Sequence, residues 1–386
     1  MLKIQVEIQR PEKQYEILLE PGLATDWKRE VEDRVPAENY IVIVDSQLAR
    51  IRNIPHNGEK VGKWGYIPFD GGEGSKTLDQ FASLCQKAFL FNPDRDTVIV
   101  AFGGATTGDM ASFLSATMLH GLRLVLVPTS LAAQIDRSVG GRNRINAGSV
   151  HNGLGTVWHP ELVLIDPTVL ESLPRREYVS GLSEMVKTAV VESADFFEQL
   201  RRGKDSLLTM NHGFLAGAIA RCCRVKSGLV AADEFCRGEQ LPLRFGHNFG
   251  ELLAVLAGSR VRHGEAISVG MVLAARLSVE RGIFPLHEYT ALRELLSGFG
   301  LPVDIAQLGA EDDDRLDWKT ILKGENVPRE LLWCNDHLGD RLGLVLPHAI
   351  GSCRFERTFT SPTLLTLPYR RGRSRGRWSR GSWGGW

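Results

Sequence analysis

Four short, continuous apolar runs in the first half of the chain constrain its fold more than any other feature. Each leads into an acidic residue, a glycine or a proline, and they occupy residues 40–45, 96–104, 122–130 and 161–167. Helix-like stretches separate the runs. Strands that are apolar throughout are buried on both faces, as in a parallel sheet with helices on each side. The sequence therefore predicts an α/β domain with a Rossmann-like parallel sheet.

Helical patterns dominate the second half, where amphipathic or buried helices follow one another. We expect an α/β domain over residues 1–176, a mostly helical domain over 177–367, and a disordered Arg/Gly/Trp tail over 368–386. Residues 2–8 alternate apolar and polar side chains, which predicts a strand and not a signal peptide. Residues 329–356 predict a short hairpin or an edge strand near the end of the fold.

Composition limits the classes of protein that this chain can be. Of its 386 residues, 43% are apolar, which excludes a disordered chain, a collagen-like repeat and a small disulfide scaffold. Its 46 basic residues balance 46 acidic ones, so overall charge gives no reason to expect nucleic acid or membrane binding. No apolar run approaches the roughly 18 residues of a membrane span. Six scattered cysteines without a CxxC pair favour free thiols in the reducing cytoplasm.

The tail from Tyr369 carries six arginines and no acidic residue. Segments rich in arginine, glycine and aromatic residues can stack on single-stranded nucleic acid. The alternative is an extension without a function, and we favour it because no second feature supports the first reading. We therefore expect neither a nucleic acid nor a membrane as a partner.

A glycine-rich turn between an expected strand and an expected helix is the first candidate binding site. Backbone N–H groups at such a turn can approach a phosphate, and the glycines that would allow this are Gly103, Gly104 and Gly108. The alternative is a tight strand-to-helix turn without a ligand. Two features favour a nucleotide: Asp45 ends an earlier strand, where an acid can bind a ribose hydroxyl, and Glu73 and Lys76 lie in a nearby glycine turn.

A second candidate site combines one carboxylate with two imidazoles. Glu184 and Lys187 are three residues apart and share one helix face, while His247 and His263 each precede a long apolar helix. One carboxylate and two histidines suit a catalytic Zn²⁺ that keeps positions open for substrate oxygens. The spacing is not diagnostic, and ordinary loop histidines are the alternative.

A third candidate site is the polar, glycine-rich stretch 133–155, which we expect to form a loop. Arginine, histidine and asparagine side chains in such a loop suit an anionic or polyhydroxyl ligand. The alternative is a solvated surface loop. The polar residues concerned are Asp136, Arg142, Arg144, Asn146, His151 and Asn152.

These motifs together resemble 3-dehydroquinate synthase and its sugar phosphate cyclase relatives. The resemblance rests on FGGATTGD, VPTSLAAQIDRSVGG, LIDP, ESLPRREYVSGLSEMVK, VAADE, FGHNFG and HGEAISVGM, which occur in the family's order. It extends from about residue 40 to about residue 285. The resemblance implies an N-terminal NAD-binding domain and a C-terminal helical domain that holds a divalent metal, Zn²⁺ or Co²⁺.

The activity implied by the resemblance is a phosphate-eliminating cyclisation of a sugar-acid phosphate, 3-deoxy-arabino-heptulosonate 7-phosphate. In the family a hydroxyl is oxidised to a ketone, phosphate is eliminated, the ketone is reduced again and an aldol addition closes the ring. A ketone acidifies the neighbouring C–H bond, which makes the elimination feasible. NAD is regenerated, so there is no net redox change. The resemblance also implies the shikimate pathway, a cytoplasmic location and a homodimer.

Carried over by position, the resemblance assigns roles to individual residues of this chain. Glu184, His247 and His263 match the metal ligands. The residues that match cofactor contacts, besides the three glycines, are Asp45, Glu73, Lys76, Asp109, Thr129 and Ser130. The residues that match or replace substrate-site residues are Asp136, Arg142, His151, Asn152, Lys187, Lys226 and Arg244.

The departures from the family pattern fall in the substrate site. Arg142 and His151 each replace a lysine, and Gln240 stands where an arginine binds the substrate carboxylate. The other departures are Arg244 for an asparagine, Glu251 for a histidine and His120 for an arginine. Arginine offers a planar fork where lysine offers a point charge, so these changes are not conservative.

The departures leave three alternatives to the sugar-acid phosphate. The chain could cyclise another sugar phosphate in cyclitol-type secondary metabolism. It could be a metal-dependent alcohol dehydrogenase, or an NAD-binding homologue without activity.

Overall fold

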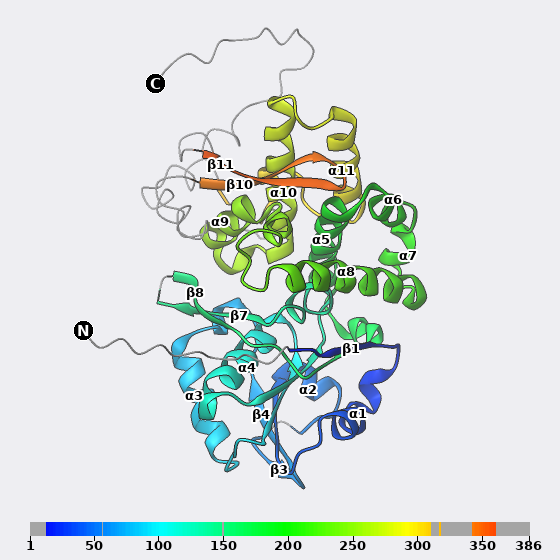
Figure 1. Cartoon of the computed structure of the whole chain (residues 1–386). Helices are drawn as coiled ribbons and strands as arrows, with labels where there is room; N and C mark the ends of the chain where they lie inside the picture. Colours follow the sequence, from blue (N-terminus) through cyan, green and yellow to red (C-terminus); the bar gives the residue numbers. More distant parts are fainter. Residues whose placement is uncertain (1–12, 56, 149, 310–315, 318–341, 360–386) are drawn as a thin grey trace, which may run out of the picture.

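The computed structural model describes residues 13–55, 57–148, 150–309, 316–317 and 342–359. It has a lobe built on a seven-stranded sheet and a lobe built on helices, shown below and above in Figure 1. The sheet order is β1–β9–β6–β5–β2–β4–β3, with all neighbours parallel except β3 and β4. The strands are β1 (Glu16–Leu19), β2 (Tyr40–Asp45), β3 (Lys60–Val61), β4 (Trp64–Phe69), β5 (Val98–Gly103), β6 (Arg123–Pro128) and β9 (Leu162–Ile165).

The predicted α/β fold with a parallel sheet is confirmed, and its four apolar runs form β2, β5, β6 and β9. Alternate residues of these strands face two separate apolar cores. On β2, Ile41 and Ile43 belong to one core, while Tyr40, Val42 and Val44 belong to the other. Burial on both faces explains why the runs contain no polar alternation.

Helices cover both faces of the sheet. On one face, α3 (Leu78–Phe89) and α4 (Ala105–Thr117) contribute residues such as Leu84 and Met110 to the core. On the other, α1 (Trp27–Arg34) and α2 (Ser46–Ile51) contribute residues such as Trp27 and Leu48.

The order of the strands reverses between β2 and β5. From β2 the chain crosses to β4 on one side, and it then returns to β5 on the other side of β2. In open α/β sheets, ligands bind at the carboxyl ends of strands where the order reverses in this way. Asp45 and Gly103, the last residues of β2 and β5, mark that place.

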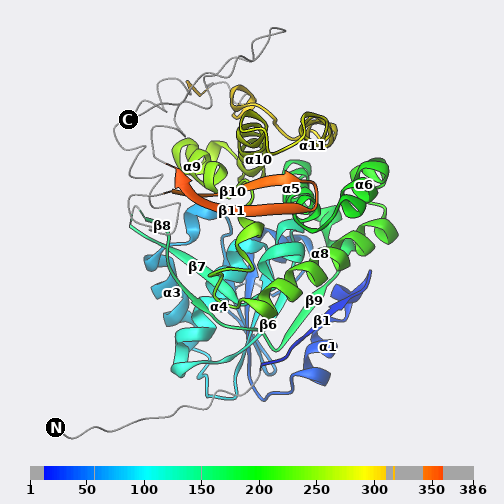
Figure 2. The ribbon, with the colours of Figure 1, turned by 45° about the horizontal axis from the view of Figure 1, so that its top comes forward.

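The second lobe is mostly helical, as the sequence predicts. Its helices are α5 (Arg175–Glu192), α6 (Ala194–Arg202), α7 (Lys204–Leu208), α8 (His212–Ala232), α9 (His247–Ala257), α10 (His263–Glu280) and α11 (Leu286–Gly298). The antiparallel hairpin of β10 (Leu342–Ala349) and β11 (Ser352–Phe359) lies against α10 (Figure 2). None of the helices in the described part of the chain has the length and apolar character needed to cross a membrane.

The predicted loop over 133–155 is wrong for most of its length. A π-helical turn (Ala133–Arg137) is followed by the antiparallel hairpin of β7 (Arg142–Ala147) and β8 (Val150–Val157). Glycine in this hairpin serves close strand pairing: a Cβ at Gly155 would lie 2.3 Å from the carbonyl oxygen of Asn143. Glycine density therefore misled the prediction, because it marks close backbone contact as well as loops.

Two other predictions lie outside the described residues: the strand over 2–8 and the disordered tail over 368–386. A domain boundary near residue 176 stays a prediction.

Candidate functional site

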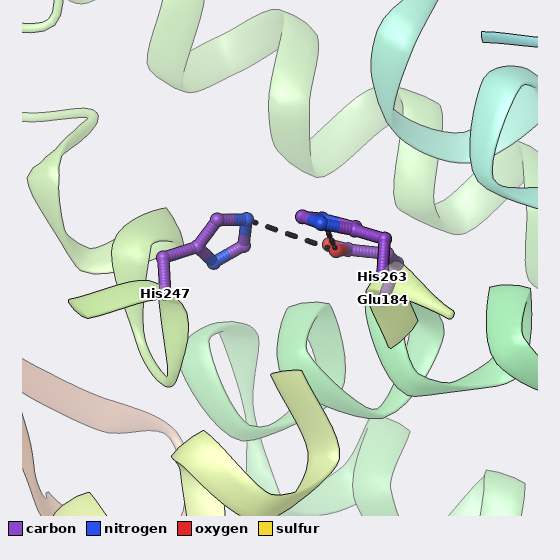
Figure 3. Close-up of side chains that lie close together, drawn as sticks. All are labelled: Glu184, His247 and His263. Carbon is purple, nitrogen blue, oxygen red and sulfur yellow. Dashed lines mark ion pairs between the residues drawn. The ribbon is translucent and has the colours of Figure 1, made fainter. Parts of the chain in front are cut away.

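Three potential metal ligands converge from three different helices. Glu184 lies in the middle of α5, and His247 and His263 are the first residues of α9 and α10. Oε1 of Glu184 is 3.7 Å from Nε2 of His247 and 3.3 Å from Nε2 of His263 (Figure 3). Ligand atoms bound to one Zn²⁺ at about 2.1 Å in a tetrahedron lie roughly 3.4 Å apart. The observed separations fit that arrangement.

A glycine beside each histidine lets its helix approach closely. Gly246 has φ 80°, and a Cβ there would lie 2.5 Å from Cγ of Met271 on α10. A Cβ at Gly264 would lie 1.9 Å from the carbonyl oxygen of Ser180 on α5. Side chains at either position would separate the helices that hold the ligands. Close helix packing therefore explains why a glycine stands next to each of these histidines in the sequence.

The protonation states suit a cation at this site. Both oxygens of Glu184 are buried, and Lys187 Nζ lies 2.5 Å from Oε2. Lys187 and the two histidines outweigh burial and hold the pKa of Glu184 well below its usual range. Burial, with Lys187 nearby, lowers the pKa of His247 to about 3, so its imidazole is neutral at pH 7. A carboxylate and a neutral imidazole are the forms that bind metal.

The carboxyl ends of β5 and β6 form the candidate nucleotide site. Gly103 must be small, because a Cβ there would lie 2.6 Å from Oγ1 of Thr107. No side chain caps the start of α4, and Gly108 on its first turns faces open space. Unpaired N–H groups at a helix start are suited to phosphate. Thr129 and Ser130 directly follow β6 and lie beside this turn. The Thr129 N–H donates to the Gly103 carbonyl oxygen, and Ser130 Oγ accepts a long hydrogen bond from the Ala133 N–H.

Two further residues refine the nucleotide site. Asp45 caps α2 by accepting from the N–H groups of Gln47 and Leu48. Sequence analysis missed Thr107, whose buried hydroxyl has no hydrogen-bond partner among the described residues. Its sequence signals are its place in the FGGATTGD motif and its distance of four residues from Gly103.

Lys76 joins residues that the sequence assigned to separate sites. Its buried ammonium lies 2.9 Å from Oδ2 of Asp109 and 3.0 Å from Oε1 of Glu73, and it donates to Oδ1 of Asn152 at 2.7 Å. His151 Nε2 lies 2.9 Å from the same Glu73 oxygen. His151 and Lys76 outweigh burial and hold the pKa of Glu73 well below its usual range. The expected cofactor residues and the expected substrate residues therefore share one hydrogen-bonded cluster.

Asp136 and Lys226 link the two lobes. Lys226 on α8 donates to the Asp136 carboxylate at 2.7 Å and to the Asp136 carbonyl oxygen on the π-helical turn. Burial favours the neutral acid, but the charges of Lys226 and Lys187 outweigh it and hold the pKa of Asp136 well below its usual range. The pair fixes both side chains beside the metal-ligand helices, because the turn packs against α5 and α8.

We expect the Asp136–Lys226 pair to make stability depend on acidity. Since the pKa of Asp136 is lower in the folded than in the unfolded chain, its contribution is present above about pH 4 and is lost as the pH falls below that value. Urea unfolding at pH 6 and pH 3.5 should show a larger loss of free energy for the wild type than for Asp136→Asn. Equal losses in the two proteins would contradict this assignment.

A cavity of about 450 Å³ lies along the β7–β8 hairpin, and Phe235 and Glu251 complete its wall. Its walls include Arg142, Arg144, His151, Asn152 and Glu251. His151 and Asn152 also contact Glu73 and Lys76, whereas Glu251 lies one helical turn after His247 on α9. The cavity therefore adjoins the Lys76 cluster and α9, which carries His247.

The residues that depart from the family pattern do not form one cluster: Arg244 and Glu251 pair with each other, whereas Gln240 and His120 lie elsewhere. Arg244 lies 3.5 Å from Glu251, and with burial opposing it, the Arg244 charge lowers the pKa of Glu251. Gln240 is buried, and its amide donates to the Asp233 carbonyl oxygen within the 233–240 turn. His120 lies after α4 and has φ 68°. Lys187, an expected substrate residue that keeps the family's lysine, pairs with Glu184 and does not line the cavity.

Sequence analysis also missed Arg137. It follows Asp136 in the π-helical turn, and its Nε lies 3.9 Å from the Asp136 carboxylate. A single charge in a polar stretch carries no signal of its position, which depends on how the turn packs against α4, α5 and α8.

Comparisons with known proteins agree with this geometry. The family model described as 3-dehydroquinate synthase N-terminal matches residues 66–180, and the one described as 3-dehydroquinate synthase C-terminal matches residues 181–317. The chain is 31% identical over 362 residues to a 3-dehydroquinate synthase from Prochlorococcus marinus (strain MIT 9215), with 91% of this chain and 95% of the relative covered.

Solved structures share the fold. A 2-epi-5-epi-valiolone synthase from Streptomyces hygroscopicus subsp. jinggangensis 5008, with NAD⁺ and Zn²⁺ bound, matches with a TM-score of 0.81 at 23% identity, covering 95% of this chain and 100% of that one. A 2-deoxy-scyllo-inosose synthase complexed with carbaglucose-6-phosphate, NAD⁺ and Co²⁺ matches with a TM-score of 0.75 at 23% identity, covering 92% and 96%.

Proposed function

The chain belongs to the 3-dehydroquinate synthase family, and from that premise we propose that it is an NAD- and metal-dependent cyclase that eliminates phosphate. The substrate class is a sugar-acid phosphate, the carbon–oxygen bond to phosphate breaks, and a carbon–carbon bond closes the ring. One observation carries this proposal above the others: a single cavity adjoins the expected cofactor residues Glu73 and Lys76 through His151 and Asn152, and the helix of His247 through Glu251.

The two cofactors fit the residues that would hold them. Glu184, His247 and His263 would bind the divalent metal, Zn²⁺ or Co²⁺, because their ligand atoms all lie within 4.8 Å of one another. Asp45, Asp109, Thr129 and the Gly103–Gly108 turn would hold NAD at the carboxyl ends of the strands. When bound, the metal would polarise a substrate oxygen and NAD would accept and return a hydride.

The chain's own residues would bind and orient the substrate. Lys187, buried beside Glu184, offers a cation to substrate oxygens near the metal ligands. Asp136, held by Lys226, can accept a hydrogen bond from a hydroxyl. Arg142 lines the cavity and can hold phosphate oxygens with a bidentate fork, while the neighbouring Asn152 amide and His151 ring supply further polar contacts.

A substrate panel tests this function. We expect phosphate release from 3-deoxy-arabino-heptulosonate 7-phosphate in the presence of NAD⁺ and Zn²⁺ or Co²⁺, with none after chelation of the metal. Release from a neutral sugar phosphate alone would move the function to another cyclase of the superfamily. Accumulation of NADH with no phosphate release would support an alcohol dehydrogenase, and NAD binding without turnover would support a non-catalytic homologue.

The proposal includes the cellular location, pathway and oligomeric state of the enzyme. The described cysteines Cys85, Cys222, Cys223, Cys236 and Cys353 are free thiols, which supports the reducing cytoplasm as its location and fits the shikimate pathway. A homodimer stays a prediction, which sedimentation would test.

A further inference from the structure

A side-chain hydrogen bond joins the two lobes beside the cavity. His159 lies between β8 and β9, and its Nε2 is 2.9 Å from Oε1 of Glu234, which lies two residues after the end of α8. A carboxylate that is ionised can only accept, so the histidine donates. Both partners adjoin the cavity wall, because Val157 and Phe235 line the cavity close to them in the sequence. The bond therefore connects the β7–β8 wall of the cavity with the wall that the helical lobe provides.

The imidazole of His159 is held in place on its other sides. The ring of Tyr15 stacks on it with the ring centres 5.8 Å apart, and the Tyr15 hydroxyl accepts from the Gly140 N–H at 3.1 Å. Gly141 has φ 66°, and a Cβ there would lie 2.8 Å from Nδ1 of His159. These contacts fix the ring with Nε2 toward Glu234, so His159 can act as an anchor.

Glu234 belongs to a compact turn that leads from α8 to the cavity. The carboxylate of the preceding residue, Asp233, closes this turn by accepting from three backbone N–H groups, those of Arg237, Gly238 and Gln240. A turn that is closed on itself in this way keeps its internal shape. The position of Glu234 therefore decides where the next residue, Phe235, is placed.

Phe235 brings an apolar surface to a cavity whose walls are otherwise largely polar. Its side chain is 47% exposed, and Leu154 of β8, which lines the same cavity, is 41% exposed. The guanidinium of Arg237 lies over one face of the Phe235 ring, 5.7 Å from its centre. Ligand cavities combine a few polar groups with apolar walls that cover the carbon atoms of the ligand. In a sugar phosphate, the C–H groups of the carbon chain suit an aromatic ring.

We propose that Phe235 contacts the carbon chain of the substrate, and that His159 and Glu234 are positioning residues that hold Phe235 at the cavity. This inference rests on the proposed cyclase function, because its ligand is the substrate of that reaction. It differs from the Asp136–Lys226 link between the lobes in that it acts on substrate binding through a third residue.

The test compares two single variants with their combination, using 3-deoxy-arabino-heptulosonate 7-phosphate as substrate. We expect His159→Ala and Phe235→Ala each to raise KM by roughly 5-fold to 30-fold, with kcat within about twofold of the wild type, since an apolar contact far from the reacting bonds stabilises bound substrate and transition state alike. The double variant should be no weaker than the weaker single variant, because His159 acts through Phe235. Effects that multiply in the double variant would overturn the inference.

Matched variants separate this role from a general effect on the link between the lobes. His159→Gln keeps a side-chain donor and should recover most of the loss, whereas Glu234→Ala removes the same bond at a more exposed residue and should match His159→Ala. His212 forms a similar pair at the other end of α8, where its Nε2 lies 2.8 Å from Oε1 of Glu171. We expect His212→Ala to equal the wild type in KM and kcat.

Thermal melting checks that every variant is folded, and calorimetric NAD⁺ binding and metal content should equal those of the wild type. A KM that rises as much in His212→Ala as in His159→Ala would overturn the inference and leave the cyclase function intact. The same holds if His159→Ala lowers kcat and leaves KM unchanged.

If the wild type binds NAD⁺ but releases no phosphate, the proposed function fails, and a measurement without substrate decides the positioning role. Cys236 is a half-buried free thiol next to Phe235, and its labelling by iodoacetamide can be followed by peptide mass spectrometry. Faster labelling in His159→Ala and Glu234→Ala, with His212→Ala equal to the wild type, would support this role. Equal rates in all four proteins would overturn it.

Discussion

Replacing His247 with alanine is expected to abolish turnover while the chain stays folded. His247 is one of three candidate ligands, and its neutral imidazole carries no charge that another group must balance. Loss of an outer partner of a metal ligand already costs about 10–100-fold in affinity or activity. Loss of a ligand itself should cost more than that, so phosphate release and bound metal should both fall below detection.

A matched control keeps this prediction specific. His287→Ala removes an exposed histidine on α11, and its metal content and activity should equal those of the wild type. Thermal melting of both variants checks folding. Full metal content in His247→Ala would show that the three helices do not share one ion.

Lys76→Met is expected to have the largest effect on stability. Lys76 and Asp109 are both buried, and their charged atoms are 2.9 Å apart. Removing the cation leaves the Asp109 carboxylate buried without its partner, which costs about 3–5 kcal/mol. Denaturant unfolding at pH 7 should show a fall of that size in the free energy of unfolding.

The double variant Lys76→Met with Asp109→Asn should recover most of this loss, because no buried charge is then left alone. Lys87→Met alters an exposed lysine on α3 and should stay within about 0.5 kcal/mol of the wild type. A loss in the double variant as large as in Lys76→Met would show that packing of the lysine stem, and not charge, is what matters.

Much of the sheet is predictable from sequence, for a physical reason. Strands buried on both faces need continuous apolar runs, so β2, β5, β6 and β9 can be predicted from the sequence. β4 is not, because Gly65 and Pro68 interrupt its run and resemble a turn. β1 has only four residues, too few to show a period.

Some residues of the candidate site can be predicted from the sequence and others cannot. The candidate metal ligands are found through matched motifs, whereas their spacing alone cannot show that α5, α9 and α10 meet. Thr107 and Arg137 lie within the quoted motifs FGGATTGD and VPTSLAAQIDRSVGG, but the motifs do not show how either side chain is packed. The sequence predicts a loop where β7 and β8 form a hairpin, because glycines that allow close strand pairing look the same in a sequence as glycines in a turn.

The proposed cyclase regenerates NAD⁺ within each cycle of a phosphate-eliminating cyclisation. Its most direct test counts phosphate released per NAD⁺ when NAD⁺ is limiting and equal to the enzyme, with NADH absorbance followed in the same sample. We expect many phosphates per NAD⁺ and no lasting rise in NADH. One NADH formed per molecule of substrate consumed, with no phosphate released, would contradict it.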